Sequence, residues 1–308
     1  MARTLIEAAK SAKTELARAV IEIYARTTGV MQALPFVDIQ GNALKYDIES
    51  SLPGVGFRGV NEGFTESQGV MNPVYEPLVI AGGDIDVDRF ITVTMGADQR
   101  TNQEVMKIKA LAHLWTNTFF KGDSEASPKQ FDGLQRRLTG NQLLANGSTS
   151  GGDALSLAKL DEAIDKVDDP THLCMSKAMK RLMSAAARNT SVSGYITYSV
   201  DSFGKRIMKY NDLPIIVIGE NGDFYNTLDF TEANPGGGSS VGTSIYVVSF
   251  GPQKIAGIQN GTIDVRDLGE LESKPSYRTR LEWFSGLSLW HPRAACRLYG
   301  IKNAAVTA

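Results

Sequence analysis

The chain contains little of the side-chain chemistry that marks metal and redox sites. Its 308 residues include 2 cysteines and 3 histidines. Cys174 and Cys296 lie far apart and outside any CxxC spacing, which disfavours a zinc ribbon or a disulfide framework and predicts two buried free thiols in a reducing compartment. His113, His172 and His291 stand alone, without a second ligand at helical spacing, so they predict no metal site.

Neither sign of charge dominates, and long apolar runs are missing. The chain has 32 basic and 34 acidic residues, a formal net charge of -2. A chain without a basic field does not gather nucleic acid by counterion release, so a dedicated DNA reader is disfavoured. Charged residues from Glu7 to Glu15 interrupt the amino terminus, and no later run reaches membrane-spanning length. We expect a soluble protein made in the cytoplasm.

Signatures of enzymes are missing as well. Neither GxSxG nor a Cys/His motif occurs, so hydrolase chemistry is not supported. The glycines at 236–238 are followed by neither GK[ST] nor a helix start, which predicts a loop and not a phosphate cradle. No local pattern singles out two of the 34 acids as an acid/base pair. We predict that the protein is not an enzyme and has no cofactor.

Two helices stand out in the first half of the chain. A capping box at Thr4 and Glu7 opens an apolar stripe that ends at Thr28 and Gly29, which predicts an amphipathic amino-terminal helix. This helix packs either on its own domain or, as an arm, on another subunit. The strongest helical pattern lies between residues 96 and 122 and predicts about 24 residues, roughly 36 Å of helix.

A long hairpin is predicted between these helices. Residues 36–48 and 70–80 alternate as strands do, and five glycines crowd the stretch between them. The sequence indicates a polar tip with little apolar bulk. Because isolated two-stranded ribbons are marginal in water, we expect the hairpin to rest on another subunit. Its candidate inter-subunit contacts are Lys45, Arg58, Glu62 and Glu66.

Three carboxylates follow the hairpin at alternate positions. Asp84, Asp86 and Asp88 fall on one face of a predicted strand, with Arg89 beside them. They lack the turn and the glycine of a calcium loop, so a solvated face or salt bridges between subunits are favoured over calcium binding.

The second half of the chain reads as a mixed α/β unit. Residues 140–152 predict a loop, and Ser156 and Ser176 each open a helix. The second of these helices has a basic side, for which a solvated face is favoured over nucleic-acid binding. That side consists of Lys177, Lys180, Arg181 and Arg188. Strands are predicted at 172–175, 206–210, 214–218, 244–250, 277–289 and 294–299, with turns at 221–222 and 260–261.

Several segments resemble the major capsid proteins of tailed bacteriophages. The string FDGL at 131–134 resembles the family's FxGL segment, and YNDLPII at 210–216 is similar to its "YNxLPII" strand, followed by FGP at 250–252. The run RAACRLYGI at 293–301 resembles the family's last strand. The order of arm, hairpin, long helix, α/β unit and returning strands is also similar. The resemblance covers nearly the whole chain.

The resemblance implies an α+β protein with the Hong Kong 97 capsid fold. Its parts would be an amino-terminal arm (1–35), an extended loop with flanking strands (36–80), a peripheral domain with a long spine helix (81–139), an axial domain (140–258) and strands that return to the peripheral domain (259–308).

The implied function is that of a major capsid protein that self-assembles into hexamers and pentamers of an icosahedral shell. The shell packages double-stranded DNA without sequence-specific binding and forms the virion, with no membrane. Implied partners are a portal, decoration proteins and a separate scaffolding protein or none, since the chain enters the arm directly from Met1. No motif indicates cross-linking, although Lys45 lies in the extended loop. The alternatives are an encapsulin-type shell and, with less support, an α/β enzyme built on residues 157–218.

Overall fold

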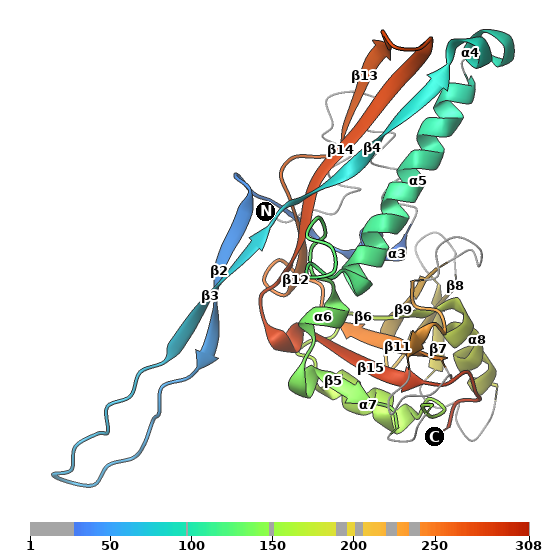
Figure 1. Ribbon diagram of the computed structural model, residues 1–308. Helices are drawn as coiled ribbons and strands as arrows, with labels where there is room; N and C mark the ends of the chain where they lie inside the picture. The colour runs from blue at the N-terminus through green and yellow to red at the C-terminus, as the bar shows by residue number, and fades with distance from the viewer. Residues whose placement is uncertain are drawn as a thin grey trace.

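The computed structural model describes residues 28–96, 98–147, 151–188, 196–200, 206–219, 227–233 and 241–307. The predicted amino-terminal helix, the glycine triplet and the turn at 221–222 lie outside these residues. Two sheets and a two-stranded hairpin make up the fold, which is α+β as predicted (Figure 1). None of the helices in the described ranges is both long and apolar enough to cross a membrane.

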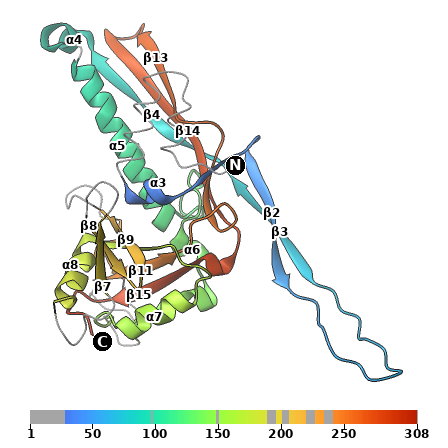
Figure 2. The same ribbon diagram turned by 180° about the vertical axis from the view of Figure 1, so that it is seen from behind.

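The first sheet is built around one long strand, β14 (Ser276–Leu289). Its first ten residues pair antiparallel with β4, and its last five pair with β12, so β14 connects two ends of the molecule. The long helix α5 (Asp98–Lys121) runs beside β4 and β14 in both views (Figures 1 and 2). Its 24 residues confirm the predicted length. The other strands of this sheet are β1 (Phe36–Asp38), β4 (Val79–Asp88), β12 (Ile255–Gln259) and β13 (Asp264–Glu270).

Three aromatic side chains fasten α5 to this sheet. Trp115 of α5 lies with its ring centroid 5.9 Å from that of Trp283 on β14, and Phe36 of β1 lies 5.5 Å from both. The buried indole N–H of Trp115 donates to Ser285 Oγ at 3.2 Å, so its polar atom has a partner. Aromatic side chains bury large areas, and this cluster therefore fixes the helix, β1 and β14 against one another.

The second sheet has eight strands in the order β5-β15-β11-β6-β9-β8-β7, with β10 beside β11. It is mixed, as predicted, because β6 and β9 are parallel whereas β11 is antiparallel to both of its main neighbours. Its strands are β5 (Leu143–Ala145), β6 (His172–Ser176), β7 (Ile196–Val200), β8 (Arg206–Tyr210), β9 (Leu213–Ile218), β10 (Glu232–Ala233), β11 (Val241–Val248) and β15 (Ala295–Ile301).

Both faces of this sheet are covered. Helices α7 (Leu157–Asp165) and α8 (Lys177–Ala186) pack on one face, where Ile245 and Val247 of β11 are buried. Tyr246, which lies between them in the strand, points to the opposite face and contacts Phe120 near the end of α5, with ring centroids 5.1 Å apart. A strand buried on both sides needs a continuous apolar run, which explains the composition of β11. The remaining described helices are the short α-helices α3 (Gly29–Ala33), α4 (Arg89–Met95) and α6 (Leu134–Arg137) and the 3-10 helices η1 (Gly140–Gln142) and η3 (Pro292–Ala294).

The two cysteines lie in this lobe. Cys174 on β6 and Cys296 on β15 are buried free thiols, as predicted. Burial raises the pKa of Cys296 to about 11 and raises that of Cys174 further, so both are un-ionised near neutral pH.

The last strand corrects the expected chain path. β15 does not return to the sheet beside the spine helix; it pairs with β11 and β5 in the eight-stranded sheet. Its Cys296 and Leu298 side chains complete the apolar cluster under α7 and α8, which explains this placement. The loop expected at 140–152 also contains a strand, since β5 pairs in parallel with β15. The strands that do join the first sheet are β12, β13 and β14.

Close packing between β1 and β12 yields a stability prediction. A Cβ added to Gly257 on β12 would lie 2.3 Å from Cε1 of Phe36, inside the aromatic cluster. We expect Gly257→Ala to lower the free energy of unfolding by about 1–3 kcal/mol, because overpacking displaces a fixed ring. Urea denaturation of the unassembled subunit measures this. Gly56→Ala is the control, since no atom lies within 4 Å of the added Cβ; equal stability of both variants contradicts the prediction.

Candidate functional site

The hairpin leaves the body of the molecule and ends in an exposed tip. Strands β2 (Ala43–Ser51) and β3 (Val70–Pro77) pair antiparallel, and residues 52–69 extend beyond them without touching either lobe (Figures 1 and 2). The predicted hairpin is confirmed, but the strand expected at 36–48 is divided: residues 36–38 form β1 and pair with β12 in the first sheet, and the hairpin strand begins at Ala43. The expectation of a polar tip with little apolar bulk is wrong. Apolar side chains are exposed there, among them Leu52, Val55, Phe57, Val60 and Phe64.

Such a tip has no core of its own. Val55 and Val60 are 96% and 93% exposed, and Phe57 is fully exposed. A soluble monomer rarely presents a group of large apolar side chains in this way, and such patches mark surfaces that bind another protein. The hairpin tip is therefore the first candidate assembly surface.

Two of the charged residues singled out from the sequence shape the turn at the tip. Arg58 Nη1 donates to the carbonyl oxygen of Glu62 at 3.0 Å, and its guanidinium lies 5.2 Å from the ring centroid of Phe64. Glu62 Oε2 in turn accepts from the backbone N–H of Gly59 at 2.8 Å. Glu66 is exposed on the same segment. Lys45 lies apart from them on β2, with Nζ 5.5 Å from the Tyr75 ring. Their role between subunits stays a prediction.

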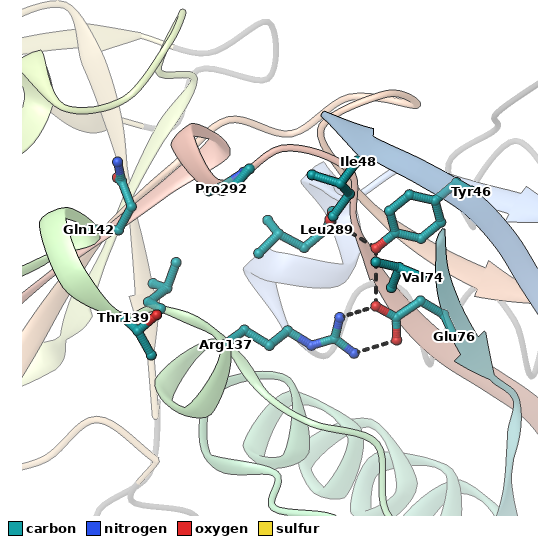
Figure 3. Close-up of a pocket in the computed structure, with 10 residues that line it drawn as sticks. Tyr46, Ile48, Val74, Glu76, Arg137, Thr139, Gln142, Leu289 and Pro292 are labelled. Carbon is teal, nitrogen blue, oxygen red and sulfur yellow. Dashed lines mark hydrogen bonds and ion pairs between the residues drawn. The ribbon is translucent and has the colours of Figure 1, made fainter. Parts of the chain in front are cut away.

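The base of the hairpin is held by a buried charged network (Figure 3). Arg137 of α6 makes two parallel bonds to the carboxylate of Glu76 on β3, with Nη2 2.7 Å from Oε2. Tyr46 of β2 places its hydroxyl 3.1 Å from Glu76 Oε1 and 2.9 Å from the carbonyl oxygen of Leu289. Its ring stacks on Trp290 at 4.6 Å between centroids. A bidentate pair of this kind fixes direction as well as distance, so it orients the hairpin.

Burial sets the protonation state of this network. Desolvation, followed by the negative charge of Glu76, raises the pKa of Tyr46 well above its ordinary value, so the phenol keeps its proton as a donor. The network borders an open pocket of about 270 Å³. Within the pocket lining, Tyr46, Glu76 and Arg137 hydrogen-bond to one another and to the backbone of Leu289, which is the arrangement of an anchor.

No local pattern in the sequence pointed to this anchor. In the structure Glu76 is the one buried residue of β3, and a buried carboxylate requires a partner. Its partner Arg137 lies shortly after the FDGL segment, 61 residues later in the chain than Glu76. The spacing alone does not reveal the pair.

A second apolar surface lies at the far end of the spine. Helix α4 buries none of its residues, and Asp88 caps it by accepting the backbone N–H of Phe90 at 2.7 Å. The side chains of Phe90, Val93 and Met95 are mostly exposed. Because an amphipathic helix is normally stabilised by its packed apolar face, this helix is a second candidate assembly surface.

The alternating aspartates have partners in their own chain. Asp84 accepts two bonds from Arg280, at 2.7 and 2.8 Å, and Asp86 accepts two from Arg278 at the same distances. Both arginines lie directly opposite on β14. The pairs lie on a partly solvated face, as favoured from the sequence, and salt bridges between subunits stay a prediction. Within the described ranges, no group of three acidic, histidine or cysteine side chains is arranged to hold a metal ion.

Comparison with known proteins shows what this chain is similar to. A family model described as "Major capsid protein GP7" matches residues 12–158. Among solved structures, the chain is similar to the holo-SrpI encapsulin complex from Synechococcus elongatus PCC 7942, with a TM-score of 0.65, 16% identity, and coverage of 91% of this chain and 89% of that chain. No curated protein sequence matches the chain.

Two further similarities are to a capsid and to a phage structure. The capsid of the native GTA particle gives a TM-score of 0.63 at 14% identity, covering 89% of this chain and 90% of that chain. A structure from Mycobacterium phage Bobi gives 0.60 at 13% identity, covering 85% and 84%. The fold is therefore that of the shell-forming proteins with Hong Kong 97 architecture, as predicted. With the match over residues 12–158, the resemblance to the major capsid proteins of tailed phages is confirmed.

The anchor of the hairpin is open to a direct test. Arg137→Gln leaves the Glu76 carboxylate buried without its cation, and we expect the free energy of unfolding to fall by about 3 kcal/mol. The adjacent Arg136 contacts Asp123 and Glu125 in more exposed positions, so Arg136→Gln is the matched control, with an expected loss of less than about 1 kcal/mol. Guanidinium denaturation of the unassembled subunit compares them. Equal losses contradict the assignment of Arg137 as the anchor.

The pairs of Asp84 with Arg280 and of Asp86 with Arg278, called here the aspartate ladder, predict that the stability of the subunit falls in acid. Hydrogen bonds from Arg280 lower the pKa of Asp84, and those from Arg278 and then Lys274 lower the pKa of Asp86. Both pKa values lie below the ordinary 3.8, so the stabilisation is complete above that value and is lost as the pH falls below it.

We therefore expect subunit stability to be independent of these two carboxylates at pH above about 5 and to decline below about pH 4. Urea denaturation at a series of pH values should show a shallower acid decline for the Asp84→Asn/Asp86→Asn variant than for the unaltered chain. Identical declines would remove the ladder from the acid response.

Proposed function

We propose that this chain is the major head subunit of a tailed bacteriophage, which assembles into hexamers and pentamers of an icosahedral shell around double-stranded DNA. The observation that carries the proposal is the hairpin, whose exposed apolar tip is held by a buried anchor and has no core in its own chain. The fold and the family match are those of capsid proteins, which agrees with a structural role and not a catalytic one.

The physical basis of assembly is burial of these tips against neighbouring copies. Each large apolar side chain contributes about 1.5–3 kcal/mol when it is moved from water into a packed contact. A stable interface buries roughly 1,600 Å² in total, and a subunit that both offers a hairpin and receives one makes several such contacts. The shell is then held by many modest contacts at once, so that losing one does not release a subunit.

Other parts of the proposal follow from the same resemblance. The mature shell is the virion head, and its partners are a portal, decoration proteins and, during assembly, a scaffolding protein. An encapsulin-type shell is the second candidate, because an encapsulin is among the similar structures. The match to a major capsid family favours the phage head.

Electron microscopy of the purified protein, combined with size-exclusion chromatography, is the direct test. We expect closed shells, tubes or capsomer rings, because these are far larger than an ordinary oligomer. Native purification then separates the two candidates: double-stranded DNA inside the particles supports the phage head, and an enclosed protein cargo supports the encapsulin. Small uniform particles under every assembly condition would contradict both.

Substitutions at the tip should stop assembly without unfolding the subunit. For Phe57→Ser/Phe64→Ser we expect the association constant to fall by more than about 100-fold, from about 2 kcal/mol for each lost ring, at an unchanged melting temperature. Val200→Ser is the control, since Val200 is an exposed apolar residue on β7, far from the hairpin. Light scattering during assembly measures the effect.

We also expect charge reversal at Arg58 or Glu66 to weaken assembly more than folding. Normal shell yield in the Phe57/Phe64 variant and in the charge-reversed variants would exclude the tip as a contact.

A further inference from the structure

The polar side of helix α8 carries charge of one sign. Its buried side is formed by Met179, Met183 and Ala186, which pack on the eight-stranded sheet. By the 3.6-residue period of a helix, the opposite side collects the basic residues. These are Lys177, Lys180 and Arg181, joined by Arg188 just beyond the end of the helix and about two turns after Arg181. Within the described part of the chain, neither Lys180 nor Arg181 forms an ion pair.

The neighbouring antiparallel strands β7 and β8 extend this basic side. The hydroxyl of Tyr198 on β7 lies 3.3 Å from Ser184 Oγ on α8, and the guanidinium of Arg206 on β8 lies 5.4 Å from the Tyr198 ring centroid. No residue of α8, β7 or β8 is acidic. We call this set of residues, Lys177, Lys180, Arg181, Arg188, Tyr198 and Arg206, the α8 basic face.

Local electrostatics disfavours part of this arrangement. Lys180 and Arg181 lie in the first turns of α8, where the helix dipole favours negative charge. Helix α7, on the same face of the same sheet, has no such excess. Its Glu162 pairs with Lys159 at 2.6 Å and with Lys166 at 3.6 Å. Departures from local rules of this kind concentrate at functional sites, where a bound partner supplies the opposite charge.

We propose that the α8 basic face binds the phosphate backbone of double-stranded DNA without sequence specificity. This inference rests on the proposed function, which places duplex DNA inside the shell. A ten-residue helix presents its charges along about 15 Å, and a duplex carries one negative charge per roughly 1.7 Å of its axis, so several phosphates lie within reach of this row. Long, flexible lysine and arginine side chains suit contacts that position a duplex and carry no sequence information.

The inference also orients the subunit in the shell. Helices α7 and α8 cover the same face of the eight-stranded sheet, and α5 ends on the opposite face. If α8 contacts the packaged duplex, the face that carries α7 and α8 lines the interior.

The test measures binding of a short fluorescent duplex DNA of mixed sequence to unassembled full-length subunits over a range of salt concentrations. We expect Lys180→Gln/Arg181→Gln to weaken binding by at least about tenfold at 0.1 M salt and to reduce the slope of log K against log salt by about 2. The control is Lys129→Gln/Lys302→Gln, which removes the same charge from two exposed lysines elsewhere and should match the unaltered chain.

Shell formation by the same variants separates this inference from the proposed function. Normal shells of the variant with weakened DNA binding by its subunits support the inference. Closed empty shells of the unaltered chain that no longer bind added duplex, although its free subunits do, support the interior position. Unchanged affinity and slope in normal shells overturn the inference and leave the proposed function intact. Loss of shells at unchanged DNA affinity also overturns it and assigns the α8 basic face to a contact between copies of the chain.

Discussion

The packing of Trp115 on Trp283 and Phe36 is the contact on which the rest of the subunit depends. It fastens the spine helix α5 to β14, the strand that pairs with β4 along one half and with β12 along the other. The end of β14 also supplies the carbonyl oxygen of Leu289 to the hairpin anchor. Both candidate assembly surfaces, the hairpin tip and α4, are therefore carried by elements that this aromatic cluster holds in place.

Because these elements are held in place, the exposed apolar residues that they carry can act as contact surfaces. A free loop would lose conformational entropy on every contact, whereas the Glu76–Arg137 pair fixes the direction in which β2 and β3 leave the body and carry the tip with Phe57 and Phe64. The subunit buries its own core well but leaves apolar side chains at two extremities, and this is the pattern expected of a protein completed by its neighbours. The aspartate ladder has the opposite character, because Asp84 and Asp86 are satisfied within the chain.

Much of the fold could be predicted because its signals are local. The helix at 98–121 follows from an apolar stripe at three- and four-residue spacing, and the long strand β14 follows from alternation over residues 277–289. The turn at 260–261 carries a glycine with φ of 77°, which only glycine adopts readily. The motifs at 131–134 and 210–216 pointed to the capsid family. What the sequence did not convey was which exposed residues mattered, since the tip appeared polar by composition.

By itself the sequence determined the elements, the free thiols and the resemblance to a capsid protein, because each depends on residues close together in the chain. Only the tertiary structure decided what those elements contact. Arg137 meets Glu76 across 61 positions, Arg280 meets Asp84 across 196, and Tyr46 meets Leu289 across 243. β15 joined the eight-stranded sheet because burying Cys296 and Leu298 beneath α7 and α8 required it. Such pairings arise from packing of the whole chain, and no spacing within a local window encodes them.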